Sequence, residues 1–143
     1  MKNTSSQGGF TLIELVVVIT ILGILAAFAV PRFAGLEVQA RSATVQALGG
    51  SVRSSAALAR ALWLASGQPG TVTMEGNPIT MVNGYPNRAT LADTLSDTTG
   101  FTYTAATGVF TRDGASTPAN CSVTYTEAAA NEAPEVDVVL TGC

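Results

Sequence analysis

The chain has 143 residues and a net charge of −3, and it contains no histidine. Its one lysine, Lys2, lies at the N-terminus, so the chain offers no imidazole for acid–base chemistry or metal ligation and no further lysine for a Schiff base. We therefore expect a protein that is not an enzyme and uses no metal or cofactor. The length limits the chain to one domain with an appended segment.

The N-terminal part divides into a polar leader and a long apolar run. Residues 1–9 are polar with one positive charge, which is typical of a targeting leader. The run from Phe10 to Val30 contains a single charged residue, Glu14. As a helix it would span roughly 31 Å, about the thickness of a bilayer core. We expect residues 10–31 to form a hydrophobic, membrane-spanning helix.

Beyond Pro31 the helical pattern continues as an amphipathic helix over residues 32–66. Gly67 and Pro69 predict its end near Ser66. Pro31 removes a helical hydrogen bond and glycines such as Gly23 weaken the helix, so we expect it to open between these two residues. Apolar residues recur in steps of three and four along one predicted stripe, which consists of Phe33, Leu36, Ala40, Ala43, Ala47, Leu48, Val52, Ala56, Ala59, Leu62 and Trp63.

Residues 67–143 have the pattern of a small β-sheet head. The segments "TVTM" and "ITMV" flank a turn at "EGNP", and Asn83-Gly84 marks a second turn. The segments "FTYTA", "VFTRD", "SVTYTEA" and "EVDVVL" follow, and their period of two fits an antiparallel sheet with one covered face. Between them, Thr90 and Asp93 have the spacing of a capping box and predict one brief helix. The predicted fold class is α+β, with the amphipathic half of a long N-terminal helix packed on a small antiparallel sheet.

Charge and cysteine content add two expectations. Residues 32–70 carry four arginines against Glu37, whereas residues 71–143 carry eight acidic residues against two arginines. These regions either attract one another between subunits or carry scattered, solvated charges. A membrane-targeting N-terminus places the rest of the chain in an oxidising compartment, where Cys121 and Cys143 favour a disulfide over two buried free thiols.

Glu14 decides between three interpretations of the N-terminus. A secretory signal would be cut after Ala27-Phe28-Ala29 and release a chain starting at Val30, and a signal anchor would not be cut at all. In the third interpretation, cleavage after Gly9 leaves the apolar helix on the mature chain. A carboxylate at hydrocarbon depth is costly, so its presence indicates a use for it there.

The segment "GGFTLIELVVVITILGILAAFAVPRF", about residues 8–33, resembles the class III signal of type IV (type IVa) pilins and of the pseudopilins of type II secretion. This resemblance implies that a prepilin peptidase cuts between Gly9 and Phe10 and methylates the new amino group of Phe10. It implies that Glu14 pairs with that amino group on a neighbouring subunit. Pro31 aligns with the proline near which the helix opens in filaments.

The resemblance implies a structural subunit of a type IV pilus, made as a bacterial inner-membrane precursor and polymerised with copies of itself into an extracellular filament. An assembly ATPase, a platform protein and a secretin are the implied partners, and adhesion, attachment or motility is the implied role. The alternative is a pseudopilin. Bound Ca²⁺ would favour this alternative, whereas the cysteine pair argues against it. The motifs "PRF", "NGYP" and the terminal "GC" resemble the mannose-sensitive haemagglutinin (MSHA) pilins.

Nucleic acid is not an expected partner, because an acidic head repels phosphates. Four neighbouring carboxylates offer oxygen ligands for Ca²⁺, but their spacing matches no known loop and we favour a solvated acidic face. These residues are Glu127, Glu132, Glu135 and Asp137.

Overall fold

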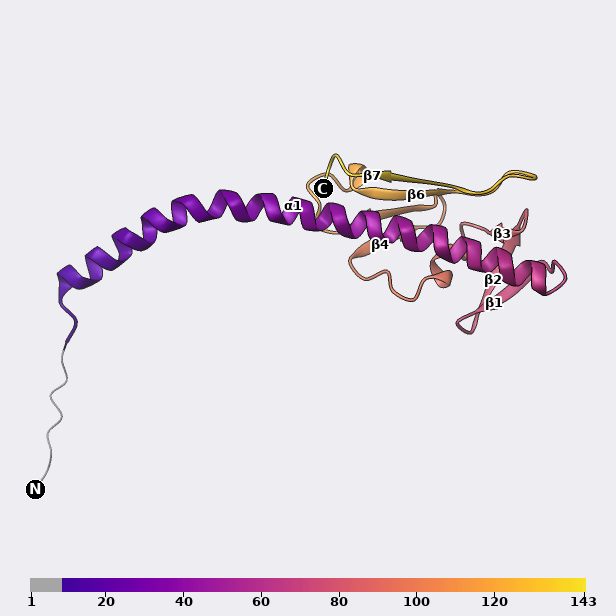
Figure 1. Ribbon diagram of the computed structural model, residues 1–143, viewed down its shortest axis with the longest axis horizontal. Coiled ribbons are helices and arrows are strands. Elements are labelled where there is room, and N and C mark those ends of the chain that lie inside the picture. Colours follow the sequence, from indigo (N-terminus) through magenta and orange to yellow (C-terminus); the bar gives the residue numbers. More distant parts are fainter. Residues whose placement is uncertain (1–8) are drawn as a thin grey trace, which may run out of the picture. The chain divides into compact units, whose positions relative to one another are not determined.

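The structure of the chain is a computed structural model that describes residues 9–143, with only the backbone described for residues 31–34. The chain divides into two compact units, with the boundary between Glu37 and Val38. One α-helix, α1 (Leu12–Ala65), contributes to both units (Figure 1). It begins two residues after the expected start at Phe10 and ends one residue before Ser66. The predicted long helix is thus confirmed.

The C-terminus of α1 closes with a glycine cap. Gly67 has a φ of +80°, and its N–H donates to the carbonyl of Leu64 over 3.4 Å. The N–H of Gln68 donates to the carbonyl of Trp63 over 2.9 Å. This pair of bonds is the Schellman motif, which satisfies carbonyls that the ended helix leaves free. The helix therefore stops where the sequence places its first glycine after a long glycine-free stretch.

The strands form two antiparallel sheets rather than the single sheet expected. The first has the order β1 (Thr71–Met74), β2 (Asn77–Val82), β3 (Tyr85–Pro86). The second has the order β4 (Phe101–Thr104), β5 (Val109–Arg112), β6 (Ser122–Thr126), β7 (Glu135–Val139). The predicted strand segments are confirmed, but which strands pair is a long-range property that local periodicity does not encode.

The first sheet is a run of tight hairpins. Glu75 and Gly76 both have positive φ, as do Asn83 and Gly84. Positive φ at both central residues defines the two-residue turn that matches the twist of antiparallel strands. The first turn is consequently shorter than the predicted "EGNP", because Asn77 already pairs with Met74 in the β1–β2 ladder.

The brief helix predicted near residue 90 is present, but its predicted cap is wrong. It is a 3-10 helix, η1 (Leu91–Thr94), and Thr90 makes no side-chain cap bond to it. The hydroxyl of Thr90 instead donates to Oδ1 of Asn87 over 2.8 Å and accepts the N–H of Thr80 over 3.1 Å. The hydroxyl thus joins η1 to the neighbouring strand β2. A second 3-10 helix, η2 (Pro118–Asn120), precedes β6.

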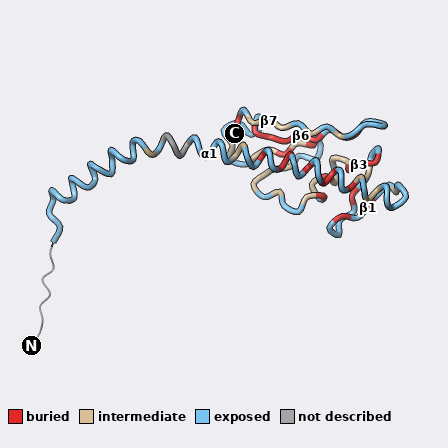
Figure 2. The backbone as a smooth tube through the Cα atoms, in the orientation of Figure 1, coloured by how far each residue is buried: buried red, intermediate tan, exposed pale blue. Residues whose placement is uncertain are grey.

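In the unit that begins at Val38, α1 packs its buried face on the sheets (Figure 2). Val45, Leu48 and Val52 join a core with Phe110 and Tyr125 of the second sheet. Nearer its end, α1 buries Ala59 against a smaller core that comprises Val72, Met74 and Ile79 of the first sheet.

The predicted apolar stripe was right for one part of α1 and wrong for another. Ala56 is buried as predicted, and Leu62 and Trp63 are half-buried. Val45 is buried although the predicted stripe omitted it. Four residues of that stripe are exposed instead: Leu36, Ala40, Ala43 and Ala47.

Three arginines of α1 bind carbonyl groups of their own chain. Arg41 donates to the carbonyl of Cys143 over 3.1 Å and Arg53 to that of Val136 over 2.6 Å. Arg60 donates to the carbonyl of Asn83 over 3.1 Å. These bonds attach three positions of the helix, about two or more turns apart, to Cys143, to β7 and to the turn between β2 and β3. Whether these arginines also attract the acidic head of another subunit stays a prediction.

Candidate processing and assembly site

The predicted cleavage point lies on exposed chain directly before α1. Gly9 and Phe10 have no regular secondary structure, and the Phe10 side chain is 86% exposed. Residues 1–8 of the predicted leader lie outside the described part of the chain. Proteolytic cleavage favours exposed chain outside helices and strands, and residues 9 and 10 are of this kind.

Glu14 folds back onto the first residue before the helix. The N–H and the hydroxyl of Thr11 donate to Oε2 of Glu14 over 2.8 and 2.7 Å. In return, the N–H of Glu14 donates to the hydroxyl of Thr11 over 3.3 Å. This reciprocal pair is a capping box, which satisfies two donors that the helix start would otherwise leave free.

This cap is not among the predictions above, although the sequence carries its signal. The segment "TLIE" has the Thr-x-x-Glu spacing and precedes an apolar run. The cap places a carboxylate at the positive end of the helix dipole. Only Oε2 receives protein hydrogen bonds in the described residues, so Oε1 stays open to a donor from outside the chain.

Among the described residues, the apolar run of α1 is exposed along its length. By length and composition α1 can cross a membrane, and its most apolar window is fully uncovered by the described residues. Soluble monomers rarely expose a contiguous apolar surface of this extent. Side chains at least 45% exposed occur all along the run: Leu12, Ile13, Leu15, Val16, Val17, Val18, Ile19, Ile21, Leu22, Ile24, Leu25, Phe28 and Val30.

The helix opening expected between Gly23 and Pro31 is absent from the single chain. The helical assignment of α1 is continuous through both residues. A Cβ built at Gly23 would meet no atom within 4 Å, so no contact within the chain requires a glycine there. The opening therefore stays an expectation for the assembled state alone.

The two cysteines form the predicted disulfide. Cys121 and Cys143 are bonded, with their Cα atoms 4.8 Å apart, and both are buried. The preceding residue, Gly142, donates to the carbonyl of Asn120 and accepts the N–H of Thr117. The last residues of the chain are thus joined to the start of β6 by a covalent bond and by backbone hydrogen bonds.

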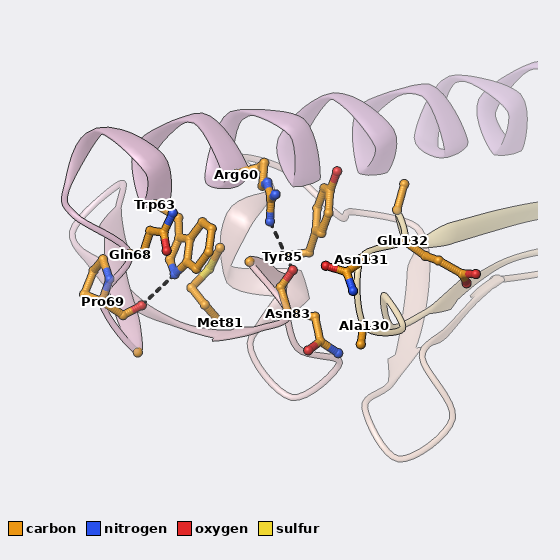
Figure 3. A pocket seen from close by; sticks show the side chains of 13 residues that line it. Arg60, Trp63, Gln68, Pro69, Met81, Asn83, Tyr85, Ala130, Asn131 and Glu132 are labelled. Atoms are coloured by element: carbon orange, nitrogen blue, oxygen red, sulfur yellow. Dashed lines mark hydrogen bonds between the residues drawn. The ribbon is translucent and has the colours of Figure 1, made fainter.

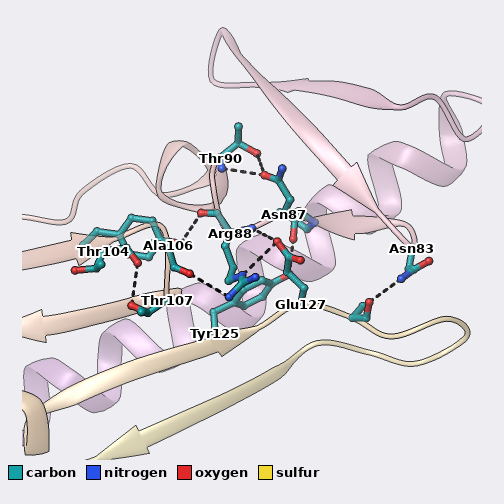
Figure 4. Close-up of polar contacts among 12 residues, drawn as sticks. Asn83, Asn87, Arg88, Thr90, Thr104, Ala106, Thr107, Tyr125 and Glu127 are labelled. Atoms are coloured by element: carbon teal, nitrogen blue, oxygen red, sulfur yellow. Dashed lines mark hydrogen bonds and ion pairs between the residues drawn. The ribbon is translucent and has the colours of Figure 1, made fainter.

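The acidic residues near the C-terminus do not gather into a ligand set. Glu127 accepts the N–H of Arg88 over 2.7 Å and pairs with its guanidinium over 3.5 Å (Figure 4). Arg88 also donates to the carbonyl of Ala106. Over residues 9–143, as far as their side chains are described, no three His, Cys, Asp or Glu side chains lie close enough to hold a metal ion. Glu127, directly after β6, therefore binds Arg88, which in turn binds the turn at Ala106.

Comparison with known protein families points to the same N-terminal segment. Residues 4–30 match the family described as the prokaryotic N-terminal methylation motif. A similar protein is the type IV narrow pilus major component PilA5 of Thermus thermophilus, which is 59% identical over 51 residues. That match covers 36% of this chain and 44% of the relative, so the chain spans less than half of the relative's length. No solved structure matches the chain.

Proposed function

We propose that the chain is a structural subunit of a type IV pilus. One observation carries the proposal: residues 4–30 match a methylation motif, and within that segment Glu14 is the single charge on an apolar helix that nothing else in the described chain covers. The similarity to a pilus major component supports it. The role is structural, because the motif and the uncovered helix serve assembly rather than chemistry.

Assembly follows from the cost of isolated charge in an apolar environment. Cleavage between Gly9 and Phe10 creates a free amino group, and methylation leaves it positively charged. When that amino group meets Glu14 of a neighbouring subunit, each charge removes the other's desolvation penalty. A pairing that does not close on itself, repeated from subunit to subunit, generates a helical filament. Opening near Gly23 and Pro31 would then adjust helix packing in the filament.

The subunit begins as an inner-membrane precursor and becomes part of an extracellular filament. A prepilin peptidase, an assembly ATPase, a platform protein and a secretin would act on it. The C-terminal disulfide supports a pilin over the pseudopilin alternative. Within the pilins we place the chain with the MSHA group, on "PRF", "NGYP" and the terminal "GC". Adhesion, attachment or motility would be the role of the filament.

The test is the mass and yield of filaments sheared from cells that carry type IV pilus machinery and express this chain. The expected subunit starts at methylated Phe10 and is two hydrogens lighter than the reduced chain. Glu14→Gln should lower filament yield about tenfold or more, since an unpaired buried charge costs several kcal/mol and about 1.4 kcal/mol is a factor of ten.

Glu37→Gln is the matched control, because Glu37 lies on the same helix beyond the apolar run and its variant should keep the yield. The Glu14 variant should still be cleaved and keep its disulfide. Normal filament yield from Glu14→Gln would contradict the pairing, and a mature chain that starts at Val30 would contradict the whole proposal.

A further inference from the structure

A polar groove lies at the C-terminal end of α1. Its walls are the last turns of the helix, the Asn83-Gly84 turn and the loop between β6 and β7 (Figure 3). The cavity has a volume of about 630 Å³, which falls within the range of small-molecule sites. Its lining mixes aromatic rings with planar polar groups and includes Arg60, Trp63, Gln68, Tyr85, Asn131 and Glu132.

Arg60 is a charged group in this groove without a carboxylate partner. Its guanidinium lies 4.8 Å from the centroid of the Trp63 ring and 5.0 Å from that of the Tyr85 ring. Its one hydrogen bond within the described residues runs from Nη1 to the carbonyl of Asn83, and no carboxylate among them forms an ion pair with it. The side chain of Glu132 points away from it (Figure 3). Several N–H groups of the guanidinium therefore stay available to a ligand.

Contacts between its walls support the shape of the groove. A Cβ at Gly84 would collide with the Arg60 guanidinium and lie 2.8 Å from the Trp63 ring, so only glycine lets these side chains approach the turn. The amide of Asn83 donates to the carbonyl of Ala128 over 2.8 Å, which links the turn to the opposite wall (Figure 4). The indole N–H of Trp63 donates to the carbonyl of Pro69 over 2.8 Å. A preformed site binds at a lower entropic cost.

The hydrogen-bonding side chains of the groove indicate the class of ligand that it binds. A guanidinium fixed over two rings presents a planar fork that matches a carboxylate. The amides of Gln68 and Asn131 can both donate to and accept from hydroxyl groups. We propose that this groove binds a small acidic saccharide, with the carboxylate of the sugar on Arg60 and its hydroxyl groups on the amides. An extended polyanion such as nucleic acid fits less well, because residues 71–143 carry eight acidic residues against two arginines.

The chain carries its own reporter of binding, since Trp63 is its one tryptophan. The full-length chain in non-ionic detergent is titrated with glucuronate while tryptophan emission is recorded, and saturation-transfer NMR follows the ligand protons independently. We expect a saturable response to glucuronate and none to glucose or acetate at equal ionic strength. Arg60→Gln should weaken glucuronate binding roughly tenfold or more, as expected for a lost charged hydrogen bond.

Arg41→Gln is the matched control: it also removes an α1 arginine bonded to a head carbonyl, but Arg41 does not line the groove, so glucuronate affinity should be unchanged. If Arg60→Gln fails to fold, Arg60→Lys keeps the charge without the planar fork and should bind several-fold more weakly. The proposal is overturned by no response to glucuronate, by an equal response to glucose or acetate, by unchanged affinity in the Arg60 variant, or by preferential binding of a short single-stranded DNA. Filament formation is not needed for this test, so its failure leaves the proposed function intact.

Discussion

Gly49 and Gly50 are neighbours in α1 with different surroundings. A Cβ on Gly49 would lie 2.7 Å from Cγ2 of Val138, a stiff β-branched side chain on β7. A Cβ on Gly50 would meet no atom within 4 Å. Glycine in a helix interior costs about 1 kcal/mol relative to alanine. The first glycine is therefore needed for helix–sheet contact, whereas the second only weakens the helix.

We predict that Gly50→Ala raises the free energy of unfolding by about 1 kcal/mol and that Gly49→Ala lowers it. Overpacking a filled contact costs about 1–3 kcal/mol, which outweighs the gain of about 1 kcal/mol in helix propensity over most of that range. Urea unfolding of the two variants in the same detergent measures both effects. Equal stabilisation by both alanines would contradict the close packing of α1 on β7.

Two tyrosines should make the head sensitive to alkaline pH. Burial raises the pKa of Tyr103 to about 12 from its ordinary value of 10.0, with the charge of Arg88 opposing this and that of Glu127 adding to it. Burial first, and then the charge of Glu127, also raises the pKa of Tyr125. Their hydroxyls donate to the carbonyls of Arg88 and Pro86. Each folded-state phenol therefore keeps its proton at a pH where the unfolded chain has lost it.

Their contribution to stability is complete below about pH 10 and is lost as the pH rises from about 10 towards 12 and beyond. Urea unfolding at a series of pH values should show no tyrosine-dependent change from about pH 7 to 9 and a decline above about pH 10. Tyr103→Phe should make that decline shallower. Phenolate absorbance from Tyr103 appearing near pH 10 in a head that is still folded would contradict the raised pKa.

At the scale of the element, α1 carries two faces with an apolar pattern, and the sequence does not show which of them is buried. One is buried and includes Val45, Leu48 and Val52. The other follows the same steps of three and four but is exposed: Leu36, Ala40, Ala43, Ala47, Gly50, Ser54, Ala57, Ala61 and Leu64. From Leu36 to Ala47, the residues of the predicted stripe lie on the exposed face. From Leu48 onwards they lie on the buried face. Alanine suits either environment, so periodicity alone does not decide which face the sheets cover.

A matched pair of leucines tests this assignment. Leu48 is 5% exposed and Leu58 is 55% exposed, on the same helix. Leu48→Ala should lower the free energy of unfolding by about 2–5 kcal/mol through lost burial and the cavity left behind. Leu58→Ala should change it by no more than about 0.5 kcal/mol. Denaturant unfolding of the detergent-solubilised subunit compares the two, and a larger loss for Leu58→Ala would reverse the assigned faces.

Local signals predicted most of the elements, and they indicated the N-terminal segment that also matches the methylation-motif family. Gly67 predicted the end of α1, and the dipeptide Asn83-Gly84 predicted a turn. The expected export of the chain to an oxidising compartment predicted the disulfide. The division into two sheets and the carbonyl bonds of Arg53 and Arg60 depend on residues distant in sequence, which no local pattern brings together. The groove at Arg60 was missed for the same reason, since its walls come from three separate parts of the chain.

At the scale of the whole molecule, burial is distributed unevenly between the two units. All the residues of the two cores lie between Val45 and Cys143, within the second unit. In the first unit, by contrast, nearly all the described apolar side chains from Phe10 to Val30 are exposed. Folding therefore stabilises the second unit by its own contacts, and the first needs lipid or neighbouring helices to cover it.

This division predicts that a fragment of residues 38–143 folds without the rest of the chain. Because it keeps both cores and the Cys121–Cys143 disulfide, its free energy of unfolding should lie within about 1 kcal/mol of that of the full chain in the same detergent. It should also be monomeric in water without detergent, since it lacks the apolar run, whereas the full chain should aggregate there. Circular dichroism, urea unfolding and light scattering measure these properties. A fragment that is unfolded would show that residues before Val38 contribute to the stability of the head, and a fragment that aggregates would show that the exposed face of α1 alone is apolar enough to associate.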